Sequence, residues 1–327
     1  MQIDKYLEKY QPVIYKTFVN ALQSNKLSHA YLLSGSTGMP LKETAIFLAK
    51  SLICDHPAPL ACNKCITCMR VDDGNYADFM IFEGTGAKKI KKGDVEKVMT
   101  TFDKTALEKN GVMIYILHLV ETMTTVAVNS LLKFLEEPGK NVYAILTTEN
   151  ESKILPTIIS RTQVLRLKEI ERQTVIEDSI ANGVAQDDAE LLSGLYFDPN
   201  TINTVSTDEN YLKIKDLVLA QIDALLTSKE DAIFTCESIV INEIKTYPQA
   251  KLYLDLLIIF FQDMLNLTSK GDIYLKSYAT ILEDLSKKIK YVDKALLTLM
   301  NSVGQLSLNL NIGLLFDHII YEITKEE

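Results

Sequence analysis

The residues AYLLSGSTGMPLKETAIFLAK, from Ala30 to Lys50, decide the fold of this chain. They predict a buried strand, a glycine-bearing loop and an amphipathic helix, which together form the frame of a phosphate-binding loop. A working loop of the form G-x-x-x-x-G-K-[ST] brings backbone N–H groups to the phosphates, adds a lysine for the β- and γ-phosphates, and holds magnesium with a hydroxyl group.

The chemical groups of such a loop are missing here. Counted from Gly35, the second glycine position holds Pro40, the lysine position holds Leu41, and the hydroxyl position holds Lys42. A frame shifted to use Lys42 places Met39 and Pro40 at its tip, where proline has no N–H to donate. The degenerate loop comprises Gly35, Gly38, Pro40, Leu41 and Lys42. We therefore expect that ATP does not bind this site productively.

The residues after the next clear strand also lack the groups that nucleotide hydrolysis needs. Residues 112–117, VMIYIL, predict a parallel strand that is buried on both faces of a sheet. A hydrolytic NTPase ends this strand with two acids, one for the magnesium shell and one that positions the attacking water. This chain has His118 and Leu119 at those positions. We interpret His118 as a partly buried, hydrogen-bonded histidine rather than as a ligand or a base.

Four cysteines predict a metal site. Cys54, Cys62, Cys65 and Cys68 follow the spacing C-x7-C-x2-C-x2-C. Tetrahedral zinc takes four such ligands, and tight C-x2-C turns present neighbouring thiolates to one ion. A pair of disulfides is disfavoured in a reducing compartment, and the spacing does not match a ferredoxin iron–sulfur cluster. We expect structural Zn²⁺, and we interpret Cys236 as a small core residue.

Composition limits the classes of function. The chain has 327 residues, 47% of them hydrophobic, a formal net charge of -9 and a pI near 5.1. An acidic balance argues against autonomous nucleic-acid binding, which normally needs a clustered positive field. The amino terminus lacks the apolar core of a signal peptide, and acids interrupt the apolar run 252–265. We expect a cytoplasmic protein without a membrane segment.

The order of predicted elements gives the fold class. Strands alternate with helices up to residue 167, which predicts an α/β domain with a doubly wound parallel sheet. Two helices, 172–181 and 187–195, follow, and a polar stretch at 204–209 is the best linker candidate. Beyond it the pattern is helical to the end. The predicted domains are 1–167 with the cysteine knuckle at 54–68, a small helical domain at 168–206, and an all-α domain at 207–327.

Several segments resemble one family. They are HAYLLSG (29–35), NSLLKFLEEPGK (129–140), AILTTEN (144–150), ILPTIISRTQ (154–163) and the four-cysteine knuckle. Together they resemble the bacterial clamp-loader subunits of DNA polymerase III, which are AAA+ proteins. The resemblance is dense over the first half of the chain and looser beyond it. The loop and the strand end lack the residues that nucleotide chemistry needs. In this they are similar to the delta-prime branch of that family rather than to its gamma/tau motor branch.

The resemblance implies a function. The family signature S-R-C reads Ser160-Arg161-Thr162 here, which implies that Arg161, supported by Ser160, acts as an arginine finger on a neighbour's ATP. Active relatives carry a nucleotide-sensing arginine near the end of the helical lid, and residues 196–205 contain none. The resemblance also implies a helical lid at 168–206 and an oligomerisation collar at 207–327.

The implied role is that of a subunit which is not an enzyme on its own but belongs to the DNA polymerase III holoenzyme. Its implied partners are gamma/tau-type ATPase subunits, a delta-type subunit, and, through the assembly, the sliding clamp and primed DNA.

Two other interpretations stay open. One is an active ATPase motor of the same complex that uses Lys42 unconventionally. The other is a zinc-dependent DNA-binding or protein-binding adaptor, in which the knuckle at 54–68 and the lysines at positions 88, 89, 91 and 92 perform recognition. The acidic balance of the chain counts against the second.

Overall fold

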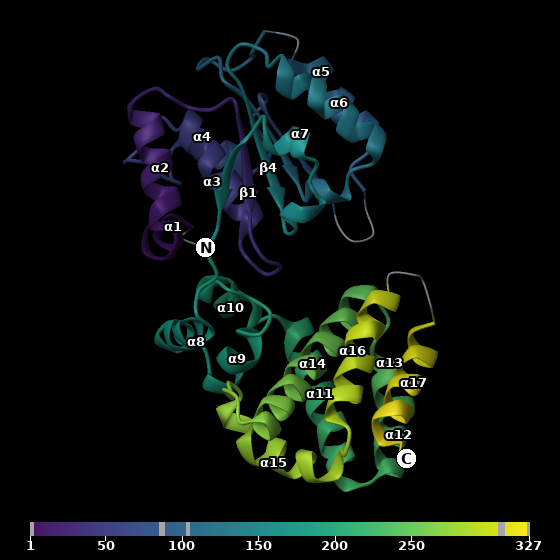
Figure 1. Ribbon diagram of the computed structural model, residues 1–327. Coiled ribbons are helices and arrows are strands. Elements are labelled where there is room, and N and C mark those ends of the chain that lie inside the picture. The colour runs from purple at the N-terminus through teal and green to yellow at the C-terminus, as the bar shows by residue number, and fades with distance from the viewer. Residues whose placement is uncertain (1–2, 85–88, 103–104, 307–310, 326–327) are drawn as a thin grey trace. The chain divides into compact units, whose positions relative to one another are not determined.

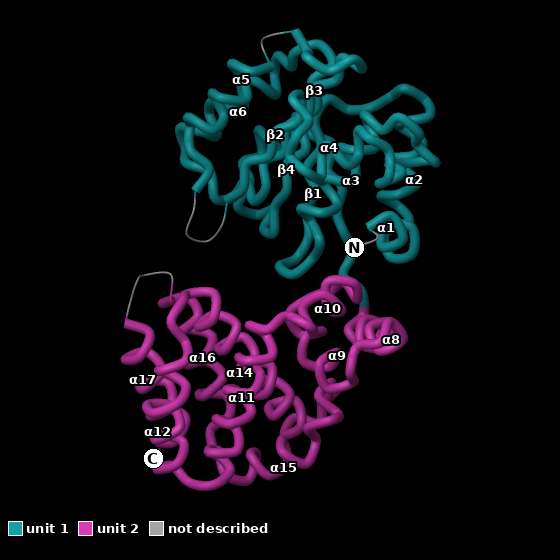
Figure 2. Tube along the Cα trace, turned by 180° about the vertical axis from the view of Figure 1, so that it is seen from behind, with its two compact units in different colours: residues 1–170 teal, residues 171–327 magenta. Residues whose placement is uncertain are grey.

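The computed structural model describes residues 3–84, 89–102, 105–306 and 311–325. The chain divides into two compact units, residues 1–170 and residues 171–327 (Figure 2). The boundaries that the sequence predicts at residues 167 and 206 stay predictions.

A parallel sheet forms the centre of the first unit. Within the described residues, five strands lie in the order β2-β3-β4-β1-β5, and all their pairings are parallel. The strands are β1 (Ala30–Ser34), β2 (Phe79–Glu83), β3 (Met113–His118), β4 (Val142–Thr148) and β5 (Gln163–Arg166). The chain leaves β1 for the β2 edge and later crosses β1 to add β5. Such sheets bind ligands beyond the carboxyl ends of the strands, where the winding direction reverses.

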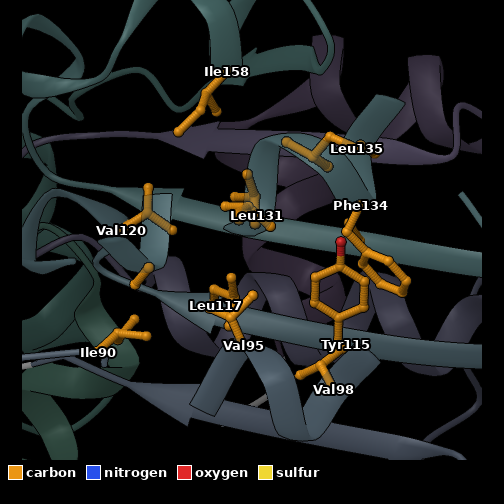
Figure 3. Close-up of a cluster of buried hydrophobic side chains, with 14 of the residues drawn as sticks. Ile90, Val95, Val98, Tyr115, Leu117, Val120, Leu131, Phe134, Leu135 and Ile158 are labelled. Carbon is orange, nitrogen blue, oxygen red and sulfur yellow. The ribbon is translucent and has the colours of Figure 1, made fainter. Parts of the chain in front are cut away.

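Helices cover both faces of this sheet, which confirms the doubly wound α/β class (Figure 1). In the first unit they are α1 (Ile3–Tyr10), α2 (Pro12–Gln23), α3 (Leu41–Ile53), α4 (Ile66–Asp72), α5 (Lys92–Phe102), α6 (Thr125–Glu136) and α7 (Pro156–Ile159). On one face, α5, α6 and α7 pack over Tyr115 and Leu117 of β3 (Figure 3). On the other, α3 contacts β1, β3 and β4, and the ring of Phe18 in α2 lies 5.4 Å from that of Tyr31.

Several short helices have no counterpart among the predicted elements, and α4 and α10 (Pro199–Val205) are two of them. Both start at a local cap. The Sγ atom of Cys65 accepts the N–H of Cys68, and the carboxylate of Asp198 accepts the N–H of Thr201 at 2.9 Å. Because a cap satisfies donors that a short helix leaves free, such a helix needs no apolar periodicity. Of the polar stretch 204–209, only residues 206–208 lie between helices, and the linker role stays a prediction.

The second unit is entirely helical within the described residues. Its helices are α8 (Arg172–Ala181), α9 (Gln186–Leu192), α10, α11 (Glu209–Thr227), α12 (Lys229–Thr235), α13 (Ile241–Glu243), α14 (Tyr247–Ser269), α15 (Ala279–Lys288), α16 (Val292–Leu306) and α17 (Ile312–Thr324). A π-helical turn, Cys236–Val240, joins α12 to α13. Cys236 is buried, as the sequence predicts.

Helix α14 is the core of the second unit. It begins at a capping box formed by Thr246 and Gln249 and packs against α11, α15 and α16. Its side chains at positions 256, 259, 260 and 261 are at most 3% exposed. This burial assigns the apolar surface of the helix to deep packing inside the unit. In the described part of the chain, α14 alone is long and apolar enough to cross a membrane, and half of that window is buried.

Charged side chains join the first helices of this unit to the rest of it. The ammonium of Lys215 in α11 lies 2.6 Å from a carboxylate oxygen of both Asp187 and Asp188 in α9. The Tyr211 hydroxyl donates to the same Asp188 oxygen at 2.6 Å. The Ser277 N–H donates to Glu190 at 2.8 Å. The helices of the predicted lid and of the predicted collar therefore pack together.

Replacement of Phe260 by alanine tests the packing of α14. Phe260 is 1% exposed and its ring lies 5.1 Å from that of Tyr278. We expect a loss of about 3–5 kcal/mol in the free energy of unfolding of the second unit, because the cavity cannot collapse fully. Phe234, which is 63% exposed, gives the matched control, and Phe234→Ala should change stability by less than about 0.5 kcal/mol. Equal losses in urea unfolding of the two variants would contradict the assigned core.

Candidate functional site

The loop at residues 35–42 lies at the carboxyl end of β1, where a nucleotide-binding fold holds its phosphates. The Gly35 N–H donates to the Thr148 carbonyl at 3.2 Å, so the end of β4 fixes where the loop begins. Gly38 has a φ of 89°, a left-handed conformation that glycine adopts without steric cost. Gly38 therefore allows the loop to turn through this left-handed conformation.

Apolar side chains fill the inside of this loop. A Cβ atom built on Gly35 would lie 2.8 Å from the Sδ atom of Met39 and 3.3 Å from Cδ2 of Leu41. Both side chains are buried. The Met39 N–H donates to the Ser36 carbonyl at 3.1 Å and the Leu41 N–H donates to the Met39 carbonyl at 2.7 Å, while Pro40 has no N–H. The loop thus offers apolar atoms where a phosphate would need free donors.

The side chain of Lys42 is engaged by an acid. Its Nζ atom lies 2.6 Å from Oε1 of Glu83, the last residue of β2. Glu83 is paired in register with His118 at the end of β3. Lys42 therefore reaches the carboxyl ends of β2 and β3 and is neutralised there.

The end of β3 carries a hydrogen-bonded histidine, as the sequence predicts. Nδ1 of His118 lies 2.8 Å from the Thr147 hydroxyl, which also accepts the Leu119 N–H at 3.1 Å. Burial lowers the pKa of His118, and Lys42 lowers it further, against the opposing effects of Glu83 and Glu121. Both effects favour a neutral imidazole at neutral pH. Leu119 has a φ of 61°, so the chain turns sharply where a hydrolytic NTPase places its second acid.

Arg161 lies at the opposite edge of the sheet from the loop. It follows α7 and precedes β5, and a hollow of about 710 Å³ beside it is lined by Ser28 and His29, which precede β1, and by Gln163, where β5 begins. The strands are parallel, so the loop at their carboxyl ends and Arg161 at their amino ends are separated by the length of β1. The structure does not bring the two groups of predicted site residues together.

The guanidinium of Arg161 is held in place. It donates to Oε1 of Glu136 at 2.7 Å, to the Thr157 carbonyl at 2.9 Å and to the Ser160 hydroxyl at 3.4 Å. Its side chain is 33% exposed. Ser160 therefore contacts Arg161 directly, and a single carboxylate neutralises the arginine at the wall of the hollow.

Sequence reasoning missed the acids that hold these two cations. It gave no role to Glu136 or to Glu83. Glu136 is 25 residues from Arg161, and Glu83 is 41 residues from Lys42. Neither separation belongs to a local periodicity, so only the packing of the strands and helices brings each pair together.

The four cysteines of the knuckle come together. Their sulfur atoms all lie within 4.8 Å of one another, and those of Cys54 and Cys65 are 3.9 Å apart. A tetrahedral ion with four Zn–S bonds of about 2.3 Å would place its sulfurs about 3.8 Å apart. The cluster can therefore hold a metal ion. The N–H of Ala61 donates to the Ser51 hydroxyl at 2.9 Å, which ties the knuckle to α3.

The thiols of this cluster differ in acidity. The N–H groups of Lys64 and Cys65 lower the pKa of Cys62 to about 6. Burial raises the pKa of Cys54 and of Cys68. A cation at the centre of the four sulfurs would favour thiolates at all of them.

The lysine run is a solvated loop and helix start in the part that the structure describes. Lys88 lies outside the described residues. Lys89 and Lys91 are exposed, and Lys92 pairs with Glu96 at 2.8 Å, one turn along α5.

Comparisons with known proteins agree with these observations. A family model described as "DNA polymerase III, delta subunit" matches residues 10–171. The DNA polymerase III subunit delta' of Bacillus subtilis (strain 168) is 29% identical over 325 residues, which cover 97% of this chain and 97% of that protein. Subunit tau of the same organism is 34% identical over 169 residues, 51% of this chain and 29% of its own length.

One solved structure shares the fold. The crystal structure of a DNA polymerase III gamma subunit-related protein from Thermotoga maritima superimposes with a TM-score of 0.54 at 18% identity. The match covers 94% of this chain and 98% of that one. Sequence and fold thus agree that the chain is similar to bacterial DNA polymerase III subunits, and the delta' subunit of Bacillus subtilis is similar to it along the full length.

Proposed function

We propose that this chain is a delta-prime-type subunit of the replicative clamp loader. It does not hydrolyse ATP, and it completes the ATP site of a neighbouring gamma/tau-type subunit with Arg161. With a delta-type subunit, the assembly opens the sliding clamp and loads it on primed DNA in the cytoplasm. The resemblance to a delta-prime subunit along 97% of both chains supports this assignment.

The opposite positions of the loop and of Arg161 are the observation that carries the proposal. An arginine finger stabilises charge on the γ-phosphoryl group and must touch it. Arg161, at the amino edge of its own sheet, cannot reach a nucleotide at the carboxyl edge of the same sheet. In a ring, however, the amino edge of one subunit can face the nucleotide of the next. Glu136 then keeps the guanidinium oriented until a phosphate competes for it.

The filled loop supports the absence of ATP hydrolysis by this chain. Met39 and Leu41 fill the loop where phosphates would lie, and Lys42 is paired with Glu83. At the end of β3, the two positions that hold acids in a hydrolytic NTPase are His118 and Leu119. A nucleotide would have to expel two buried side chains and break an ion pair at once. Each cost reduces affinity.

The knuckle is proposed to hold structural Zn²⁺. Its four cysteines would fill a tetrahedral shell and leave no open position for catalysis, so the ion would fix the excursion between α3 and β2. Sulfur ligands also match the preference of zinc over magnesium or calcium.

The thermal unfolding midpoint of the isolated chain, measured with and without MgATP, tests whether the loop at residues 35–42 binds nucleotide. A ligand that binds only the native state raises the midpoint by mass action, so about 1 mM MgATP should leave it unchanged here. A gamma/tau-type subunit in the same assay should be stabilised. A rise that Lys42→Ala abolishes would instead favour an ATPase motor that uses Lys42.

ATP turnover by a reconstituted loader tests the finger. With clamp and primed DNA present, Arg161→Ala should lower turnover at the ATP site that this chain completes by about 10³-fold or more. Arg166→Ala is the matched control, because Arg166 is also an ion-paired arginine, bound to Glu151 at 2.6 Å, and lies at the opposite end of β5. Intact complexes with unchanged turnover in both variants would leave Arg161 a structural role only.

Metal analysis tests the knuckle. The purified chain should contain one zinc ion, and Cys65→Ser should lose it and lower the unfolding midpoint of the first unit, because one ligand of a closed site is removed. Cys236→Ser changes a buried cysteine outside the cluster and should retain the ion. Equal zinc content in the wild-type chain and the Cys65 variant would disprove the site.

A further inference from the structure

A basic pocket opens on the second unit, where α15 ends and α16 begins. Its volume is about 760 Å³, and the first residue of α12 and the end of α17 complete its wall. Six lysines line it, at positions 229, 287, 288, 290, 294 and 325. Glu322 is the one acid among the described residues of the lining. We call this site the lysine pocket.

The charge of the lysine pocket is opposite to that of its surroundings. Residues 171–327 contain 13 lysines and arginines and 25 aspartates and glutamates. Nearly half of these cations thus face one pocket of an otherwise acidic unit. Mutual repulsion makes such clustering unfavourable unless an anion compensates it.

Several of these ammonium groups have no acid to neutralise them. In the described part of the chain, Lys229, Lys290 and Lys325 have no carboxylate within ion-pair distance, and all three are exposed. Lys288 has a structural task, since it donates to the carbonyls of Leu226 and Thr227 at the end of α11. The first three lysines are therefore available to an anionic ligand.

Aromatic rings stand beside the same lysines. Tyr291 lines the pocket, with the Nζ atoms of Lys294 and Lys290 at 4.4 and 5.4 Å from its ring centroid. Tyr321, next to the lining residue Glu322, is 51% exposed, and Lys229 lies 5.6 Å from its ring. A ring beside ammonium groups can stack a nucleobase while the lysines hold the flanking phosphates.

We propose that the lysine pocket binds single-stranded nucleic acid, with the backbone phosphates on Lys229, Lys290 and Lys325 and a base stacked on Tyr291. An acidic peptide would satisfy the lysines but would leave the half-buried Tyr291 ring and the exposed Tyr321 ring without a stacking partner, so the tyrosines favour nucleic acid. The site goes beyond the proposed function and does not depend on it. Glu322 and the net charge of -9 restrict binding to low ionic strength.

Fluorescence anisotropy of a labelled oligothymidylate with the full-length chain tests this site. With three to four phosphates neutralised, affinity should fall about 20- to 50-fold between about 50 and 200 mM salt. Replacement of Lys229, Lys290 and Lys325 by glutamine should weaken binding at low salt by about tenfold or more and flatten the salt dependence. The same change at Lys245, Lys270 and Lys276, three exposed lysines of the same unit, gives a control of equal charge and should cost less than about threefold.

A second variant separates nucleic acid from other anions. Tyr291→Leu keeps an apolar side chain and all the lysines, and should weaken binding about fivefold or more without changing the salt dependence. The proposal is overturned if the wild-type chain does not bind at about 50 mM salt, or if both lysine triples lose affinity equally. It is also overturned if Tyr291→Leu binds as the wild type does and decaglutamate displaces the oligonucleotide as well as unlabelled oligothymidylate does, which would assign the pocket to acidic peptides.

Discussion

Burial of the parallel sheet on both faces is the constraint on which the rest of the first unit depends. Helices cover both sides, so polar groups that must meet solvent or a partner are confined to the two ends of the strands. The carboxyl ends of β1 to β4 gather the loop, Glu83, His118 and Thr147. The amino ends of β1 and β5 carry Arg161. A single sheet thereby holds two chemically separate edges.

The two edges differ in their chemistry. At the carboxyl edge, Met39 and Leu41 are buried within the loop and Lys42 is paired with Glu83. At the amino edge, an arginine stays partly exposed and is restrained by a single carboxylate. A subunit that acts on a neighbour's nucleotide needs the amino edge with its arginine, and it does not need a nucleotide site at the carboxyl edge. The proposed function accounts for both features, because it requires Arg161 and requires no nucleotide at the loop.

The second unit depends on one buried helix. Since α14 contacts α11, α15 and α16, the apolar side chains around it are consumed inside the unit. Charged residues then define the exterior. Acids dominate it, and the lysine pocket is a local reversal of sign at the ends of four helices. The net charge of the whole chain conceals this reversal, because a sum over residues carries no information about where they lie.

The sequence by itself determined the features that repeat at short range. Alternating strands and helices, the apolar run of β3, the spacing of the four cysteines and the substitutions at Pro40, Leu41 and His118 are all readable along the chain. Only the tertiary structure decided which distant groups meet: Lys42 with Glu83, Arg161 with Glu136, and the lysines of the pocket. The short helices α4 and α10 also escaped prediction, since seven residues are too few to show a clear apolar periodicity. The physical reason is common to these cases, because periodicity and spacing report local geometry, whereas ion pairs and pockets depend on how separate elements pack.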